Sequence, residues 1–225
     1  MTTLHKQAFR GLFQLIIMLA TAIFLPAWTL NYWQAWVLLV VFGISVLIIT
    51  LYLMKNDTAL LERRMSMGAA SEKEKAQKII QSLAGIAFIA LFVVSSIDHR
   101  LGWSFVPMGV TVIGDIFVAI GLLIVFFVFR ENSFASGIIE VGPTQTVIST
   151  GPYARVRHPM YTGAFIMLAG VPPALGSWWG LVAVVPLILA IIWRLFDEEK
   201  FLMQNLPGYV AYQNTVRYRL VPFIW

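Results

Sequence analysis

Six apolar runs, nearly free of charged residues, set the fold of this 225-residue chain. The first four runs are long enough to cross about 30 Å of hydrocarbon as helices. A helix satisfies its backbone hydrogen bonds within one segment, as a lipid environment requires. We therefore predict an all-α, polytopic integral membrane protein of about six helices. The expected segments are Leu12–Leu30, Trp33–Leu53, Ile79–Ile97, Phe105–Phe129, Tyr161–Leu175 and Trp178–Trp193.

The composition agrees with a membrane protein and excludes several kinds of function. Hydrophobic residues make up 59% of the chain and charged residues 12%, whereas a soluble domain carries about 25% charged residues. The net charge of +5 reports membrane topology rather than nucleic-acid binding. The chain has no cysteine, which excludes disulfides, thiolate metal ligands and a cysteine nucleophile. Because the net charge reflects topology, we expect no nucleic-acid partner. No His, Asp or Glu residues have metal-binding spacing, so we expect no metal either.

The last two apolar segments are short, and Pro172-Pro173 interrupt the turn between them. We expect them to form a C-terminal hairpin that crosses only part of the membrane and leads into a cytosolic tail. The first segment is not followed by a small-residue cleavage site, so we expect a retained helix. The chain then forms one membrane domain, 1–225, with N-terminal helices in 1–130 and the functional part in 131–225.

The basic residues indicate the orientation of the helices. Only Arg100 falls on the outer side of the predicted spans, and such a bias places the basic loops in the cytoplasm. Both termini and both long loops are therefore expected to be cytosolic, and the charged connection Asn56–Lys78 should lie along the membrane surface. The remaining basic residues are Lys6, Arg10, Lys55, Arg63, Arg64, Lys73, Lys75, Lys78, Arg130, Arg155, Arg157, Arg194, Lys200, Arg217 and Arg219.

The stretch GPYARVRHPMYTG, residues 151–163, places several polar groups where the fifth segment enters the membrane. Pro159 suits the first turn of a helix, which puts His158 at or beside the N-cap. Free N–H groups at a helix start, together with nearby arginine side chains, favour an anionic group. Tyr153 and Tyr161 suit either stacking on a ring or the membrane interface. The motif therefore predicts a site for an anionic ligand.

A second charged cluster, RLFDEE, follows the last apolar segment. Arg194 and Glu198 are four residues apart and share one helical face, where they form either a local ion pair or part of a site. Asp197 and Glu199 point to other faces and are expected to face solvent. Asp115 lies within the fourth segment, where a carboxylate is either functional or caps a neighbouring helix. No G-x-G-x-x-G or G-x-S-x-G motif supports a dinucleotide or serine-hydrolase site.

Three stretches together carry a family resemblance: QTVISTGPYARVRHPMYTG, RLFDEE and PGYVAYQNTVRYRLVPF. From Asn132 to Phe223 the chain resembles the isoprenylcysteine carboxyl methyltransferases and is similar to the membrane phospholipid and thiol methyltransferases. The resemblance implies S-adenosylmethionine bound on the cytosolic side, with Arg194 facing the methyl acceptor and Arg194 and Glu198 carrying the chemistry. The implied cofactor-binding residues are Gln145, Thr146, Val147, Ile148, Tyr153, His158, Pro159, Met160, Tyr161 and Glu198.

The resemblance leaves the methyl acceptor open. It implies a lipophilic acceptor that enters from the bilayer, with a carboxylate of the isoprenylcysteine type as our first expectation. The alternative acceptors are a phospholipid amine and a thiol. The more distant alternative functions are an NADPH-dependent membrane reductase and a small transporter or scaffold. The chain is also similar to short bacterial versions, so we expect an integral protein of a bacterial inner membrane, with membrane lipid as its surroundings.

Overall fold

The computed structural model describes residues 3–65, 72 and 75–225, and the secondary structure in this part of the chain is helical, as predicted. Five helices are long and apolar enough to cross a membrane: α1, α2, α4, α5 and α7. The elements are α1 (Thr3–Ala27), α2 (Trp33–Asn56), α3 (Thr58–Met65), α4 (Lys75–Leu101), α5 (Met108–Glu131), η2 (Gly151–Ala154), α6 (Pro159–Ala174), α7 (Gly180–Asn205) and α8 (Tyr209–Thr215).

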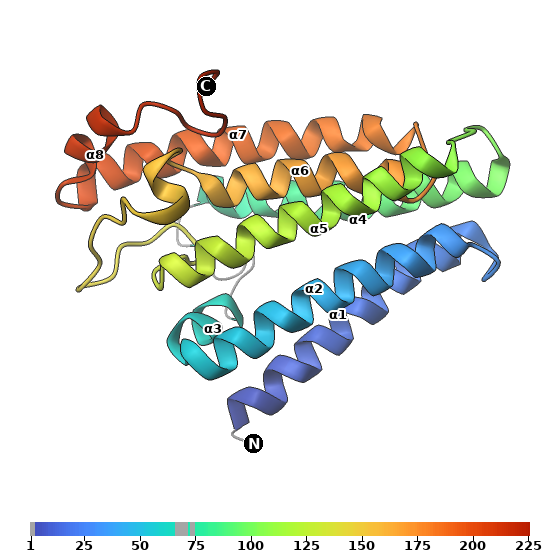
Figure 1. Ribbon diagram of the computed structural model, residues 1–225, viewed down its shortest axis with the longest axis horizontal. Coiled ribbons are helices and arrows are strands. Elements are labelled where there is room, and N and C mark those ends of the chain that lie inside the picture. Colours follow the sequence, from blue (N-terminus) through green and yellow to red (C-terminus); the bar gives the residue numbers. More distant parts are fainter. Residues whose placement is uncertain (1–2, 66–71, 73–74) are drawn as a thin grey trace.

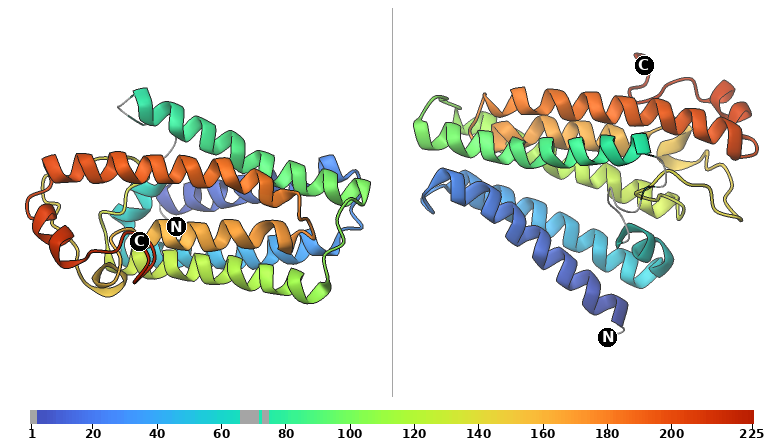
Figure 2. Two further views of the ribbon diagram at one scale, coloured as in Figure 1. Left: turned by 90° about the horizontal axis from the view of Figure 1, so that it is seen from above. Right: turned by 180° about the vertical axis from the view of Figure 1, so that it is seen from behind.

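The helices form two layers. In Figures 1 and 2, α4, α7, α6 and α5 lie side by side, and the α1–α2 pair packs across one side of them. The pair approaches this layer at the α1–α2 turn and diverges from it toward the N-terminus (Figure 1). Helices α1, α4 and α6 run in one direction, while α2, α5 and α7 return. Both termini, α3, η2 and α8 therefore lie toward one end of the bundle, which we call the site end, and the opposite end is the distal end.

The outer surface of the bundle suits a hydrocarbon environment. Large apolar side chains such as Ile48, Ile86, Ile113 and Leu189 are exposed along α2, α4, α5 and α7. A soluble monomer rarely exposes a continuous apolar surface of this size. Together with the five candidate spans, this surface supports an integral membrane protein.

The C-terminal hairpin differs from our expectation in one respect. Helix α6 is short, at 16 residues, and Pro172 and Pro173 lie in its last turn. Helix α7, however, is 26 residues long and apolar enough to cross a membrane, whereas we expected both segments of the hairpin to cross only part of it. It continues as a helix through the charged stretch after Trp193, as the shared helical face of Arg194 and Glu198 predicted. Arg194 and Glu198 are thereby held on a rigid element at the site end.

Glycines bring α5 and α6 into close contact. A Cβ atom on Gly121 would lie 2.5 Å from the Gly163 carbonyl oxygen, and one on Gly163 would lie 2.7 Å from the Gly121 carbonyl oxygen. Gly114 and Gly170 face each other in the same way, at 2.7 and 2.5 Å. Small residues let membrane helices approach to backbone contact. This seam holds the start of α6 against α5. It thereby also positions the segment Arg157-His158-Pro159, which we call the RHP motif.

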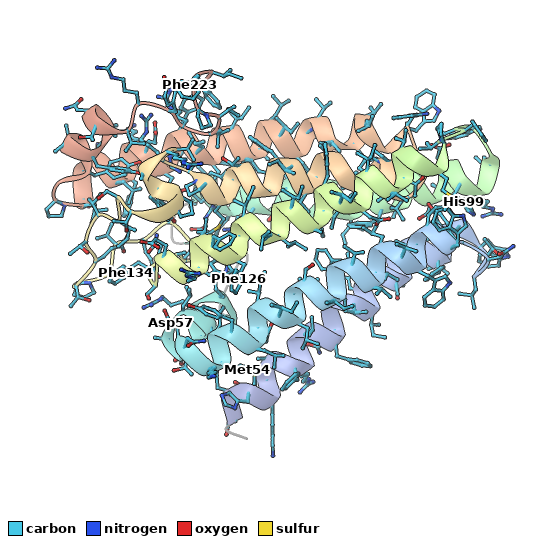
Figure 3. All side chains as sticks on the ribbon, viewed as in Figure 1. Met54, Asp57, His99, Phe126, Phe134 and Phe223 are labelled. Carbon is cyan, nitrogen blue, oxygen red and sulfur yellow. The ribbon has the colours of Figure 1, made fainter. Side chains whose placement is uncertain are left out.

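A buried polar cluster joins the loops at the distal end. Asp98 Oδ2 accepts hydrogen bonds from Ser104 Oγ at 2.6 Å and from Ser177 Oγ. The Tyr32 hydroxyl donates to the Leu175 carbonyl at 2.6 Å, and its ring stacks on His99 at 3.6 Å between centroids. Figure 3 places His99 at this end and Phe134 at the site end. The polar cluster is therefore remote from the motifs singled out by the sequence.

Candidate active site

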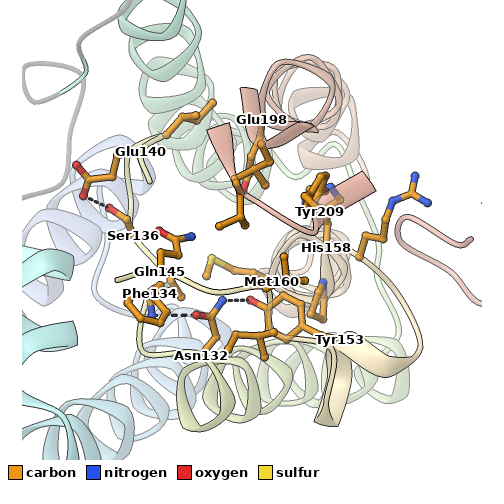
Figure 4. A pocket seen from close by; sticks show the side chains of 18 of the residues that line it. Asn132, Phe134, Ser136, Glu140, Gln145, Tyr153, His158, Met160, Glu198 and Tyr209 are labelled. Carbon is orange, nitrogen blue, oxygen red and sulfur yellow. Dashed lines mark hydrogen bonds between the residues drawn. The ribbon is translucent and has the colours of Figure 1, made fainter. Parts of the chain in front are cut away.

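A cavity of about 270 Å³ opens at the site end, between the loop after α5, the start of α6 and the end of α7 (Figure 4). Its volume is close to the lower end of small-molecule sites, about 300 Å³. Every site residue predicted from the sequence lines this cavity. These residues are Gln145, Thr146, Val147, Ile148, Tyr153, His158, Pro159, Met160, Tyr161, Arg194 and Glu198.

Glu198 is hydrogen-bonded to the first turn of α6 rather than to Arg194, its neighbour on α7. The Tyr161 hydroxyl donates to Glu198 Oε2 at 2.6 Å. Tyr161 lies in the first turn of α6, so this bond connects α6 and α7 directly at the cavity. Tyr161 also stacks against His158, with 5.6 Å between ring centroids. A carboxylate held in this way presents a fixed negative charge to a ligand in the cavity.

Arg194 has a partner far away in the sequence. Its Nη1 donates to Glu72 Oε1 at 2.7 Å and to Gln77 Oε1 at 2.9 Å, and its Nη2 donates to the Gly137 carbonyl at 2.9 Å. The local ion pair with Glu198, one of the two interpretations of their spacing, is not formed; Arg194 instead lies beside Tyr161. Part of the Asn56–Lys78 connection is therefore built into the site, although most of its charged middle lies outside the described residues.

The expectation that Glu199 faces solvent is wrong. Glu199 is buried, and its Oε1 accepts a hydrogen bond from Arg157 Nε at 2.7 Å and lies 3.3 Å from His158 Nε2. Its Oε2 accepts a bond from Arg219 Nε at 2.9 Å. Charged groups are almost never buried unless they are paired in this manner. Glu199 therefore connects α7, the RHP motif and the C-terminal tail through one carboxylate.

The expectation for Asp197 is also incomplete. Gln77 Nε2 donates to Asp197 Oδ2 at 2.7 Å, which ties the site end of α7 to the start of α4. This contact, like that of Arg194, could not be inferred from α7 alone. Both depend on where α4 lies relative to α7.

His158 is the N-cap residue of α6 with Pro159 at the first position, as predicted. The backbone N–H groups just before the helix are used by the tail: Arg157 N–H donates to the Tyr218 carbonyl and His158 N–H to the Arg219 carbonyl, both at 2.9 Å. Arg157 also donates to two tail carbonyls through Nη1, whereas Arg155 is exposed. Arg157 is thus a structural anchor of the tail more than a free cation.

Tyrosine side chains also line the cavity. Tyr153 and Tyr209 flank it in Figure 4, and Tyr212 donates through its hydroxyl to the Tyr153 carbonyl at 2.8 Å. Asn132 Nδ2 donates to the Tyr153 hydroxyl at 2.9 Å. Burial raises the pKa of Tyr153 to about 12, partly offset by the Asn132 hydrogen bond. The Tyr153 ring is therefore neutral and available for stacking at physiological pH.

The sequence interpretation missed several residues of the site. Most of them come from segments in which the sequence shows no motif for a site. The others come from the tail, which is part of the family resemblance but had no residue with an expected role. These residues are Arg64, Glu72, Gln77, Asn132, Gly137, Glu140, Tyr209 and Tyr212. The tyrosine spacing in PGYVAYQ was the one signal that could have suggested Tyr209 and Tyr212.

The structure separates Asp115 from this site. Asp115 is buried in α5, lines neither cavity at the site end, and has no hydrogen-bond partner among the described residues. Within the described part of the chain, no cluster of three His, Cys, Asp or Glu side chains has the arrangement of a metal site. The charged and polar groups that the structure brings together at the cavity are therefore those of Arg194, Glu198 and the start of α6, without Asp115.

Comparison with known proteins agrees with this picture. No curated protein matches the chain significantly. A family model does match residues 110–207, a range that runs from α5 to the end of α7 and contains the cavity loop and both charged motifs. The matching model is that of the phospholipid methyltransferases, the family that includes the isoprenylcysteine carboxyl methyltransferases, and it supports a membrane methyltransferase.

Proposed function

We propose that the protein transfers a methyl group from S-adenosylmethionine to a lipophilic acceptor at the site end of the bundle. The observation that carries the proposal is the convergence of both charged motifs on one cavity at the end of the membrane helices. The match to a methyltransferase family over the same residues supports the type of reaction. We further propose that this end faces the cytosol, where the donor is available, because the basic loops and both termini lie there.

The chemistry of the cavity fits S-adenosylmethionine. Glu198 offers a fixed carboxylate for the α-ammonium group, and the rings of Tyr153 and Tyr209 suit the adenine or the cationic sulfonium. His158 and the start of α6 suit the α-carboxylate. The Glu198 carboxylate, the tyrosine rings and the start of α6 all line the same cavity. The donor would therefore be held with its methyl group in a defined direction.

Our first candidate for the acceptor is a carboxylate of the isoprenylcysteine type, held by Arg194. An acceptor oxygen forms a bond to the methyl carbon while the bond from that carbon to the sulfonium sulfur breaks. The electron pair of the broken bond stays on sulfur as a neutral thioether, and the carboxylate becomes an ester without any proton transfer. Such a reaction depends on in-line positioning and exclusion of water. Arg194 belongs to the long helix α7, which supports the in-line positioning of the acceptor.

The second candidate is a phospholipid amine, which is favoured by the family model that matches residues 110–207. A protonated amine must lose a proton before it can attack the methyl group. Our candidates for accepting that proton are Glu198, which lines the cavity and would then not hold the α-ammonium group of the donor, and a cavity tyrosine such as Tyr161. Tritiated methyl transfer into a membrane extract distinguishes the candidates: release of volatile tritiated methanol by base indicates a methyl ester, whereas label that stays on a non-volatile amine headgroup indicates a phospholipid amine.

Donor binding tests the proposal directly. Calorimetry on the purified protein should show binding of S-adenosylmethionine and not of NADPH, and Glu198→Ala and His158→Ala should abolish or strongly weaken it. Arg155→Ala is the matched control, because Arg155 belongs to the same motif but is exposed. Absence of S-adenosylmethionine binding by the wild-type protein would refute the proposal, and binding of NADPH instead would favour a reductase.

A further inference from the structure

A second cavity of about 760 Å³ adjoins the first at the site end. It lies between the start of α4, the end of α7 and the loop 139–145, and the two cavities share Ile139, Glu140 and Gln145. Arg194 lines only the first cavity, whereas Glu72 lines only the second. The Arg194–Glu72 ion pair therefore stands between them.

Contacts with other residues of the chain use much of the hydrogen-bonding capacity of Arg194. A guanidinium has five N–H donors, and three of them are engaged by Glu72, Gln77 and Gly137. Both hydrogens of Nη1 are occupied. The side chains of Arg194 and Glu72 are 14% and 2% exposed, and Glu72 also accepts a hydrogen bond from Gln81. A carboxylate of the chain itself thus occupies a guanidinium hydrogen that a carboxylate ligand of Arg194 would use.

We propose that Glu72 is a specificity-determining residue that occupies the place on Arg194 taken by an acceptor carboxylate, and that the second cavity holds the polar end of that acceptor. This inference rests on the proposed methyl transfer to a carboxylate. Exchange of one carboxylate for another keeps Arg194 neutralised throughout, so no buried charge is left without a partner. Lys200, which lines the second cavity, offers the displaced Glu72 a cation. A neutral acceptor makes no charge-assisted bond to Arg194, so it gains little whether or not Glu72 is displaced.

The test compares two probes that differ only in charge. The first is an N-acetyl-S-farnesylcysteine with a free carboxylate, and the second is its carboxamide. Binding of each is measured with the full chain in lipid nanodiscs for the wild type, Glu72→Gln and Asp197→Asn. Asp197→Asn is the matched control, because it removes a carboxylate from the same cavity without a contact to Arg194. S-adenosylmethionine binding is measured in parallel.

Glu72→Gln should bind the carboxylate probe about tenfold more tightly than the wild type, because the internal competitor for a charge-assisted bond is gone. Binding of the carboxamide and of S-adenosylmethionine should be unchanged, and Asp197→Asn should behave as the wild type. Equal tightening of both probes, or none, would overturn the proposal. If Glu72→Gln does not fold, Glu72→Asp decides the matter: its shorter side chain retains the charge but reaches Arg194 less well, so the same selective tightening is expected in smaller measure.

The outcomes also separate this inference from the proposed function. Failure of the wild type to bind S-adenosylmethionine contradicts the methyltransferase proposal. If the wild type binds the donor but neither it nor Glu72→Gln binds the carboxylate probe, the role of Glu72 is wrong while donor binding stands.

Discussion

Glu199 on α7 accepts a 2.7 Å hydrogen bond from Arg157, the residue directly before His158, the N-cap of α6. The same carboxylate also binds Arg219 of the tail. One buried anion therefore holds together α7, the start of α6 and the C-terminal tail beside the candidate active site. The neighbouring Glu198 lines the cavity instead, so the two adjacent glutamates have different surroundings, and only Glu198 is placed where a ligand could reach it.

Replacement of Glu199 by alanine should destabilise the protein strongly. Breaking a buried ion pair by removal of one partner costs about 3–5 kcal/mol, because the remaining charge is left uncompensated. Arg157, with a side chain only 6% exposed, would bear that cost. Thermal unfolding in detergent should show a clear drop in midpoint, whereas Glu62→Ala, at an exposed position on α3, should change the free energy of unfolding by less than about 0.5 kcal/mol. A wild-type midpoint for Glu199→Ala would contradict the proposed anchoring role.

The glycine seam predicts a second stability effect. Gly121→Ala places a Cβ atom against the Gly163 carbonyl, so α5 and α6 must separate, at a cost of about 1–3 kcal/mol. Gly85→Ala is the matched control on α4, where nothing lies within 4 Å of the new atom. That control should be neutral or stabilising by up to about 1 kcal/mol, since alanine favours helix more than glycine. Equal midpoints for the two variants would argue against close packing at the seam.

The Tyr161–Glu198 bond should affect donor binding more than stability. Tyr161→Phe removes the hydroxyl that donates to Glu198 at 2.6 Å and leaves the carboxylate free to rotate. A hydrogen bond to a charged group contributes about 1.5–3 kcal/mol, so affinity for S-adenosylmethionine should fall by about tenfold or more. Tyr52→Phe, where the ring packs on Phe126 away from the cavity, should leave affinity unchanged. Calorimetry of both variants against the wild type provides the comparison.

The ionisation of Tyr153 gives a pH-dependent prediction. Because burial raises the pKa of Tyr153 to about 12, the folded protein keeps this hydroxyl protonated at pH 10.5, where an unperturbed tyrosine of pKa about 10 is mostly ionised. The stability that this shift provides is present below about pH 10 and is lost as the pH rises toward 12. Tyrosinate absorbance at pH 10.5 should therefore be the same for the wild type and Tyr153→Phe while both are folded. A lower absorbance for the variant would show that Tyr153 ionises normally.

The helices and the two charged motifs could be predicted from the sequence because they depend on local properties. The length of each apolar run determines the spans, and Pro159 after His158 determines where α6 begins. The length of α7 was predicted less well: the apolar run that ends at Trp193 suggested only partial crossing, whereas the helix, which was expected to continue through Arg194 and Glu198, runs on to Asn205 and is long enough to cross. A helix can leave the membrane without ending, and hydropathy alone does not distinguish these cases.

The sequence by itself determined an all-helical membrane protein with two polar motifs near the ends of neighbouring helices. Only the tertiary structure decided what those motifs contact. Helical spacing places Glu198 and Glu199 on different faces, but the rotation of α7 against α6 decides that Glu199 is the buried one. Glu72 reaches Arg194 across 122 positions of the chain, a pairing that depends on the packing of α4 against α7 and has no local signal.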